Sequence, residues 1–382
     1  MKHKIPLLKD HHSHPFMFAI LNSCSNISLA RTKDEAIAII NSAKSNIILG
    51  WNSDWYHFTT SELKRMPPVI ICNSSFHSFL VSSSFQERFF DAEFVQHFND
   101  ANWIEKNLSK IMRFLASLKT FQPQQIEDYF TFLLRQGVYF AEEMLLAFEI
   151  DLFIKLGYLE RTQFWTSIEI FNDLSKQEYI HGIKIFADGS LGSKTAAMNY
   201  LDDQREKLVY SDVELEILIE QVASLNKALA IHAIGGQAIT QVINLISKNQ
   251  HIPETRIEHC QFISRRDAFR AKELGIILSM QPNFSFDSIR YKDRLSEQTC
   301  QDNNPFRMLI DEVGFVPGKN LILGSDGMPH GVKTALKSAF FPPFPSQKLT
   351  LEEFVAGYCM PDMQYGYISI DGQEIKVVVK GE

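Results

Sequence analysis

The stretch Lys4-Ile5-Pro6-Leu7-Leu8-Lys9-Asp10-His11-His12-Ser13-His14 places two imidazoles two residues apart behind a short apolar run. If the run leads into a β-strand, side chains at positions i and i+2 leave the same face, so His12, His14 and Asp10 point the same way. Two neutral imidazoles on one face make a half-site for Zn²⁺ or a similar metal. The alternative is a solvated His-rich tail, and the choice depends on whether later segments supply the missing ligands.

The composition describes an ordinary globular protein and excludes some partners. A chain of 382 residues can form one barrel-type domain, and 45% hydrophobic with 22% charged residues is typical. The net charge of −7 and the pI near 6.0 disfavour nucleic acid and membrane surfaces, which leaves small molecules. Five scattered cysteines without a C-x-x-C pair favour a reducing, cytoplasmic location. The apolar run 15–21 is too short to cross a bilayer.

Apolar runs alternate with helical segments along most of the chain, which predicts a parallel α/β fold. We expect residues 1–14 to form the first strand, and seven further strands to follow at 138–141, 163–170, 181–188, 229–233, 255–259, 275–281 and 320–326. The helices between them have recognisable starts, such as the capping box Ser211-Asp212-Val213-Glu214. Eight strands, each followed by helical material, predict a (β/α)₈ TIM barrel with catalytic groups at the C-terminal strand ends.

The remaining segments define the domain organisation. Residues 15–130 read as an inserted α/β excursion between strands one and two, so residues 1–350 form the barrel with its insertion. Within the insertion, the capping box Thr32-Lys33-Asp34-Glu35 predicts a helix through Ala43. Residues 351–382 predict a C-terminal helix and a hairpin with an Asp371-Gly372 turn. Because the hairpin edge is rich in valine, we expect it to dock on the barrel or on another subunit, as in a homodimer.

Metal-binding residue types recur at or near the ends of the predicted strands. They are His12 and His14 on strand one, Lys184 on strand four, His232 on strand five, His259 on strand six and Asp326 on strand eight. A buried ionisable group without a partner is costly, so their recurrence favours a shared metal site over unrelated core residues. For Lys184 the alternative is an ion pair with a carboxylate such as Asp188 or Glu142.

With this pattern the chain resembles the amidohydrolase superfamily, which carries Asp-x-His-x-His on the first barrel strand, Lys on the fourth, His on the fifth and sixth, and Asp on the eighth. The resemblance covers about residues 6–340 and is densest from 180 to 330. The branch called amidohydrolase family 3, which includes N-substituted formamide deformylase, is similar at Gly50-Trp51, Phe76-His77-Ser78, 182–198, 231–235, 256–259, 279–282 and 324–326.

The resemblance implies one or two divalent metal ions, with Zn²⁺ expected first and Fe or Mn as alternatives. His12, His14 and Asp326 would hold the more buried ion, His232 and His259 the second, and Lys184, carboxylated by CO₂, would bridge them. A carbamate is an anionic two-oxygen ligand, whereas a lysine ammonium is a poor one, and burial favours the neutral amine that reacts with CO₂. A single-metal site with unmodified Lys184 is the intermediate alternative.

The implied activity is hydrolysis of a C–N bond in a small-molecule amide or cyclic amide. Metal-bound hydroxide would attack the carbonyl, and Asp326 would act as general acid and base. The residues expected to contact the substrate are His77, Asp188, Ser190 and His330. His77 and His330 also fit surface roles. We expect His11 and Glu258 to face away from the metals, because side chains alternate along a strand.

Two expectations qualify this reading. Relatives begin and end with strands of a small β-sandwich, and since only 11 residues precede His12, we expect the sandwich to be missing or vestigial, with the C-terminal hairpin as its remnant. The alternative function is a catalytically silent barrel that binds a metabolite or regulatory partner, because fold alone does not imply activity. The complete set of six ligand types favours the enzyme.

Overall fold

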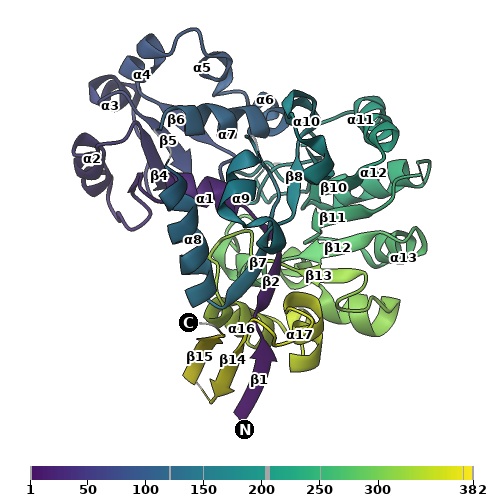
Figure 1. The fold of residues 1–382 in the computed structure, drawn as a ribbon. Coiled ribbons are helices and arrows are strands. Elements are labelled where there is room, and N and C mark those ends of the chain that lie inside the picture. Colours follow the sequence, from purple (N-terminus) through teal and green to yellow (C-terminus); the bar gives the residue numbers. More distant parts are fainter. Residues whose placement is uncertain are drawn as a thin grey trace.

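The computed structural model describes residues 2–119, 122–148, 150–202, 207–249, 251–372 and 374–380. Its centre is a sheet of eight parallel strands in the order β13-β12-β11-β10-β9-β8-β7-β2 (Figure 1). The bounds are β2 Leu8–Ser13, β7 Val138–Glu143, β8 Phe164–Thr166, β9 Ile180–Phe186, β10 Ala228–Ala233, β11 Thr255–His259, β12 Ile277–Met280 and β13 Leu321–Leu323. The sheet curls into a nearly closed (β/α)₈ barrel, which confirms the predicted fold class.

Asp10 closes the barrel between its first and last strands. The backbone N–H groups of Ser325 and Asp326 both donate to the carbonyl oxygen of His12, at 3.3 and 2.7 Å. The Ser325 N–H and hydroxyl also donate to the two carboxylate oxygens of Asp10, at 2.9 and 2.5 Å. Asp10 is fully buried, and its carboxylate links β2 to the segment after β13 through these hydrogen bonds.

Helices cover the outside of the barrel. They are α8 Pro123–Arg135, α9 Asp151–Leu156, α10 Ile168–Asp173, α11 Asp212–Leu225, α12 Gly236–Ile246, α13 Arg265–Glu273, α16 Val332–Phe340 and α17 Leu351–Tyr358. The capping box of Ser211 and Glu214 starts α11 as predicted. The predicted strand 163–170 is too long, because the Ser167 side chain caps α10 and ends the extended backbone at Thr166. No helix in the described part of the chain has the length and apolar character needed to cross a lipid bilayer.

The N-terminal residues form two strands in two sheets, so the prediction of a single strand is wrong. β1 (Lys2–Pro6) pairs antiparallel with β14 (Gly366–Asp371), whereas β2 begins at Leu8, whose N–H donates to the Gly137 carbonyl oxygen. Pro6 has no N–H to donate to a sheet, which favours the break at that point.

β14 forms a hairpin with β15 (Glu374–Val379), and the three-stranded sheet lies at the bottom of Figure 1. Asp371 pairs with Glu374, so the turn comes one residue later than predicted. Gly372 adopts a positive φ of 58°, as such turns require, and Gln373 lies outside the described residues. Ile368 is fully buried in the main core, so the hairpin packs against its own chain. That it is the remnant of a sandwich stays a prediction.

The segment between β2 and β7 contains a third sheet, at the upper left of Figure 1. Its order is β3-β4-β5-β6, with bounds β3 Ser25–Asn26, β4 Ile47–Trp51, β5 Ile70–Asn73 and β6 Phe79–Val81. The helices of this segment before α8 are α1 Pro15–Leu21, α2 Lys33–Asn41, α3 Thr60–Arg65, α4 Ser83–Arg88, α5 Glu93–His97, α6 Ala101–Lys106 and α7 Leu108–Ser117. The predicted capping box of Thr32 and Glu35 starts α2. Part of the segment has its own core, while α1 and α7 pack towards the barrel.

Candidate metal centre

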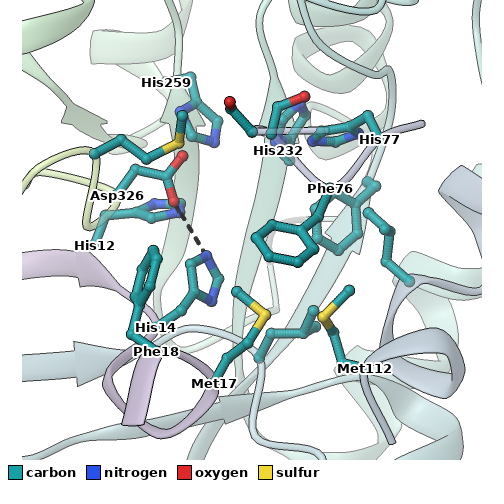
Figure 2. A pocket seen from close by; sticks show the side chains of 16 residues that line it. His12, His14, Met17, Phe18, Phe76, His77, Met112, His232, His259 and Asp326 are labelled. Carbon is teal, nitrogen blue, oxygen red and sulfur yellow. Dashed lines mark ion pairs between the residues drawn. The ribbon is translucent and has the colours of Figure 1, made fainter. Parts of the chain in front are cut away.

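The C-terminal ends of five barrel strands surround one cavity of about 60 Å³ (Figure 2). It is lined by five of the six predicted metal ligands and by His77: His12, His14, His232, His259 and Asp326. The sixth, Lys184, is 2% exposed and lies on β9, next to β10, which carries His232. The structure therefore brings together residues separated by more than 300 positions in the sequence.

The tightest cluster consists of His12, His14 and Asp326, whose nearest ligand atoms all lie within 4.8 Å of one another. Asp326 Oδ1 is 3.1 Å from His14 Nε2, the contact drawn in Figure 2, and 3.6 Å from His12 Nε2. Two imidazole nitrogens and a carboxylate oxygen are a common ligand set for Zn²⁺ and related ions.

Three of the site histidines have one ring nitrogen within hydrogen-bond distance of a protein acceptor, which leaves the other nitrogen available. The pairs are His12 Nδ1 with Glu258 Oε2 at 2.5 Å, His259 Nδ1 with Gln281 Oε1 at 2.8 Å, and His232 Nε2 with the Gly189 carbonyl oxygen at 3.0 Å. His14 Nδ1 lies 3.7 Å from Glu143 Oε1, which is an ion-pair distance. Metal-binding histidines are held in this way, because the acceptor fixes both ring orientation and tautomer.

The backbone explains why Glu258 contacts the site, contrary to the prediction. Glu258 is paired in register with His232, so both side chains leave the same face of the sheet. His259 would then point away, but its φ is +68°, and this left-handed conformation interrupts the strand alternation. Asp326 also has a positive φ, of 56°. Such strained residues are frequent at functional sites.

Lys184 is a buried amine without a hydrogen-bond partner among the described residues. Burial lowers its pKa to about 8, although the nearby carboxylates of Glu258 and Asp326 act in the opposite direction. It does not pair with Glu142, which instead contacts His11 and Arg256 inside the barrel, both at 2.8 Å. An orphaned amine beside metal-ligand residue types fits a lysine that is completed by carboxylation.

The pKa values favour ligand forms for most of the imidazoles. Burial lowers the pKa of His12 and His232 well below 6.5 and that of His259 to about 3, so these rings are neutral, as metal binding requires. His14 differs: burial would lower its pKa, but its hydrogen bond with Asp326 and the negative charges of Asp326 and Glu143 raise it to about 9.

His77 lines the cavity opposite Asp326 and is held by a carboxylate that the sequence did not reveal. His77 Nδ1 is 2.6 Å from Glu105 Oε2, and the Thr195 hydroxyl donates to Glu105 Oε1 at 3.2 Å. Glu105 is 2% exposed and lies on α6, an irregular part of the sequence without a motif. Burial lowers the pKa of His77, but the Glu105 charge and hydrogen bond more than offset this and raise it.

The other three residues predicted to contact the substrate do not line the cavity; they are Asp188, Ser190 and His330. Asp188 is fully buried and accepts backbone N–H groups from Ala197, Ile234 and Gly235 at 2.8 to 2.9 Å, so it ties two loops together. Ser190 does not line the cavity, but its hydroxyl lies 3.2 Å from that of Ser75, which does.

His330 is buried rather than solvated. Its two ring nitrogens contact the Ser13 and Ser325 hydroxyls, and Nδ1 is also 3.2 Å from Asp10. His330 therefore supports barrel closure through Ser13, Ser325 and Asp10.

Comparison with known proteins agrees with this geometry. Residues 157–337 match the model of the amidohydrolase family. The matched range contains Lys184, His232, His259 and Asp326, whereas His12, His14 and His77 lie before it. The amidohydrolase match supports a hydrolase, and the formamide deformylase branch stays a prediction.

One relative and two solved structures extend the comparison. The chain is 32% identical over 139 residues to the putative amidohydrolase YtcJ of Bacillus subtilis, a match that covers 34% of this chain and only 26% of YtcJ. An uncharacterized metal-dependent hydrolase from Pyrococcus horikoshii aligns with 22% identity and a TM-score of 0.65, covering 88% of this chain and 74% of the other. One from Pyrococcus furiosus aligns with 20% identity and a TM-score of 0.67, covering 92% and 80%. At these identities the two structures show the shared fold.

Proposed function

We propose that the chain is a metal-dependent hydrolase that cleaves the C–N bond of a small amide. The observation that carries the proposal is one cavity lined by five ligand-type residues, with the buried amine of Lys184 on a neighbouring strand: His12, His14, His232, His259 and Asp326 line the cavity, and Lys184 lies on β9 next to the strand of His232. His12, His14 and Asp326 would hold one divalent ion, and His232 and His259 a second, with carboxylated Lys184 between them.

A bound divalent ion would act as a Lewis acid and lower the pKa of a water molecule in the cavity. Asp326 would take a proton from that water on a carboxylate oxygen and deliver it to the nitrogen of the leaving amine. Its side chain is 18% exposed, so it reaches the cavity, and its contact with His14 helps to keep it ionised until the proton arrives.

Lys184 would supply the anionic ligand that completes the site. Its neutral Nζ would form a bond with the carbon of CO₂ and lose a proton, which converts an unpartnered amine into a carbamate with two oxygens. The low pKa that burial imposes increases the fraction of neutral amine available for this reaction.

The cavity favours a small acyl group, such as the formyl group suggested by the resemblance, because about 60 Å³ holds only a few water molecules. His77, fixed by Glu105, presents its free ring nitrogen to the substrate amide from the wall opposite Asp326.

The test measures metal content and turnover together. The protein is incubated with bicarbonate and Zn²⁺, Mn²⁺ or Fe²⁺, and assayed against formamides, acyl amides and cyclic amides. We expect one or two bound ions and hydrolysis of an amide, with both lost in His14→Asn and kept in His57→Asn, which changes an exposed histidine outside the cavity. Bound metal without turnover would favour the silent barrel, and neither metal nor turnover would refute the hydrolase.

A further inference from the structure

The barrel wall is incomplete beside Lys184, because β8 is shorter than β9. The pairing of β8 with β9 ends at Thr166 and Ile183, whereas β9 continues to Phe186. On its other side, β9 stays paired with β10 up to Phe186. The Ser167 side chain caps α10 directly after β8, so the chain leaves the sheet there. Among the described residues, the end of β9 therefore has a strand neighbour on one side only.

A cavity lies at this place, here called the side cavity, and Ser109, Ser167, Lys184 and Leu218 are among the residues that line it. It is bounded by α6 and α7 of the inserted segment, by the start of α10, by α11 and by β9. Leu108 and Phe186 line both the side cavity and the metal cavity and separate the two. Lys184 lines the side cavity but not the metal cavity. The side cavity therefore approaches Lys184 from outside the metal cavity.

The lining of the side cavity changes from polar and exposed to apolar and buried. Glu169 is exposed and the Lys106 side chain is 30% exposed, whereas Leu108 and Ile185 are buried. One cavity is thus lined by side chains at the protein surface and by others in the interior. Its volume is about 30 Å³, which is room for about two water molecules, so only a very small molecule fits.

The chemistry of the lining selects an uncharged molecule. The Nζ atom of Lys184 is buried and has no hydrogen-bond partner among the described residues. Glu105, which is 2% exposed, adds a carboxylate to the same lining. Bicarbonate would bring a second negative charge beside this carboxylate, and burying an unpaired charge is costly. Carbon dioxide has three atoms and no charge, so it fits both the volume and the lining.

We infer that the side cavity is the route by which CO₂ reaches Lys184. The Nζ lone pair forms a bond with the carbon of CO₂, one C–O π bond gives its electron pair to oxygen, and Nζ loses a proton to water. Ser109 on α7 and Leu218 on α11 line the route and control its width. The inference rests on the carboxylated Lys184 of the proposed function and adds the site through which CO₂ enters.

Incorporation of ¹³C tests this on the full-length protein, with a readout other than activity. The metal-free protein is freed of CO₂ and mixed with Zn²⁺ and ¹³C-bicarbonate in equilibrium with its CO₂. Carbon-13 NMR then follows the protein-bound carbamate signal with time. We expect a signal that is missing in Lys184→Met, and we compare variants by its rate of appearance and its final size.

One variant narrows the side cavity. Ser109→Leu should slow the appearance of the carbamate signal by at least about tenfold, because the larger side chain fills a closely packed space of this size. The final size of the signal should not change, since the route affects the rate and not the equilibrium. Ser338→Leu is the matched control, because Ser338 is also a buried helical serine but does not line the side cavity.

A second variant widens the side cavity. Leu218→Ala should raise the rate by at least about twofold, because it removes three carbon atoms from the lining. Leu225→Ala is its control, since Leu225 is another half-buried leucine on α11 that does not line the side cavity. This pair decides the question if circular dichroism shows that Ser109→Leu does not fold.

Equal rates in Ser109→Leu and Ser338→Leu would overturn the inference, and so would a smaller final signal that appears at the unchanged rate. Absence of any carbamate in the unchanged protein would overturn both the route and the carboxylation of Lys184. Failure of the proposed function alone looks different. In that case the variants alter the rate of ¹³C incorporation as expected, but the metal-loaded protein hydrolyses no amide.

Discussion

His12 Nδ1 lies 2.5 Å from Oε2 of Glu258, and both side chains are buried at the centre of the barrel. The carboxylate on β11 thereby fixes the imidazole on β2 with its Nε2 facing Asp326. Histidine ligands oriented by a carboxylate bind metal more tightly than free ones, because ring orientation and tautomer are set in advance.

Glu258→Gln should weaken metal binding by about 10- to 100-fold while the fold is retained, because the amide holds His12 less firmly. Competition with a chromophoric chelator measures the affinity, and circular dichroism checks the fold. Glu273→Gln, an exposed change on α13, is the control and should bind metal normally. Equal affinities in the two variants would show that Glu258 does not position His12.

Asp326→Asn should lower kcat by about 10²- to 10⁴-fold, because an amide cannot carry the proton from water to the leaving amine. Metal content must be measured on the same samples, and kcat compared at saturating metal, since Asp326 is also a proposed ligand. Asp293→Asn, whose side chain is 68% exposed, serves as the control. A fully loaded Asp326→Asn protein with normal kcat would exclude the acid–base role.

Lys184→Met should stabilise the metal-free protein and abolish activity. The variant replaces a buried amine that has no hydrogen-bond partner among the described residues by an apolar side chain of similar length, which should raise the free energy of unfolding by about 1–3 kcal/mol. Urea denaturation in the presence of a chelator measures this. A decrease in stability would indicate that Lys184 forms a structural ion pair.

Glu105→Gln should destabilise the metal-free protein more at low pH than at high pH. The folded pKa of His77 is raised above 6.5, so the His77–Glu105 pair contributes its full stability below pH 6.5 and loses it as the pH rises through the folded pKa. The difference in free energy of unfolding between Glu105→Gln and the unchanged protein should decrease between pH 6.5 and the folded pKa of His77. The decrease should be about 1.4 kcal/mol for each pH unit by which that pKa exceeds 6.5. A difference that stays constant from pH 5 to 9 would contradict this account.

Much of the barrel could be predicted from the sequence, because its strands are short apolar runs and several of them carry a metal-binding residue type at or near the end. Helix starts such as Ser211 and Thr32 were also found, since a capping box is a local signal. The break after Pro6 was missed, because whether neighbouring residues join one sheet or two depends on distant partners such as β14.

Within the site, the structure brings the six predicted metal ligands together, but several supporting residues could not be foreseen. Glu258 was assigned to the wrong face because regular alternation hid the positive φ of His259. Glu105 lies on α6, far from His77 in sequence and outside any motif. Asp188 was expected to contact the substrate, but its buried carboxylate accepts hydrogen bonds from backbone N–H groups instead. No sequence pattern distinguishes these two roles.

The closure of β2 onto the segment after β13 has a consequence for how each molecule matures. His12 and His14 are synthesised early, but Asp326 and the N–H groups that dock on the His12 carbonyl oxygen are added almost at the end of the barrel. A nascent chain on the ribosome therefore holds only an incomplete metal site. An ion held by His12, His14 and Asp326 as proposed would therefore find its complete set of protein ligands only after the last barrel strand has joined the sheet.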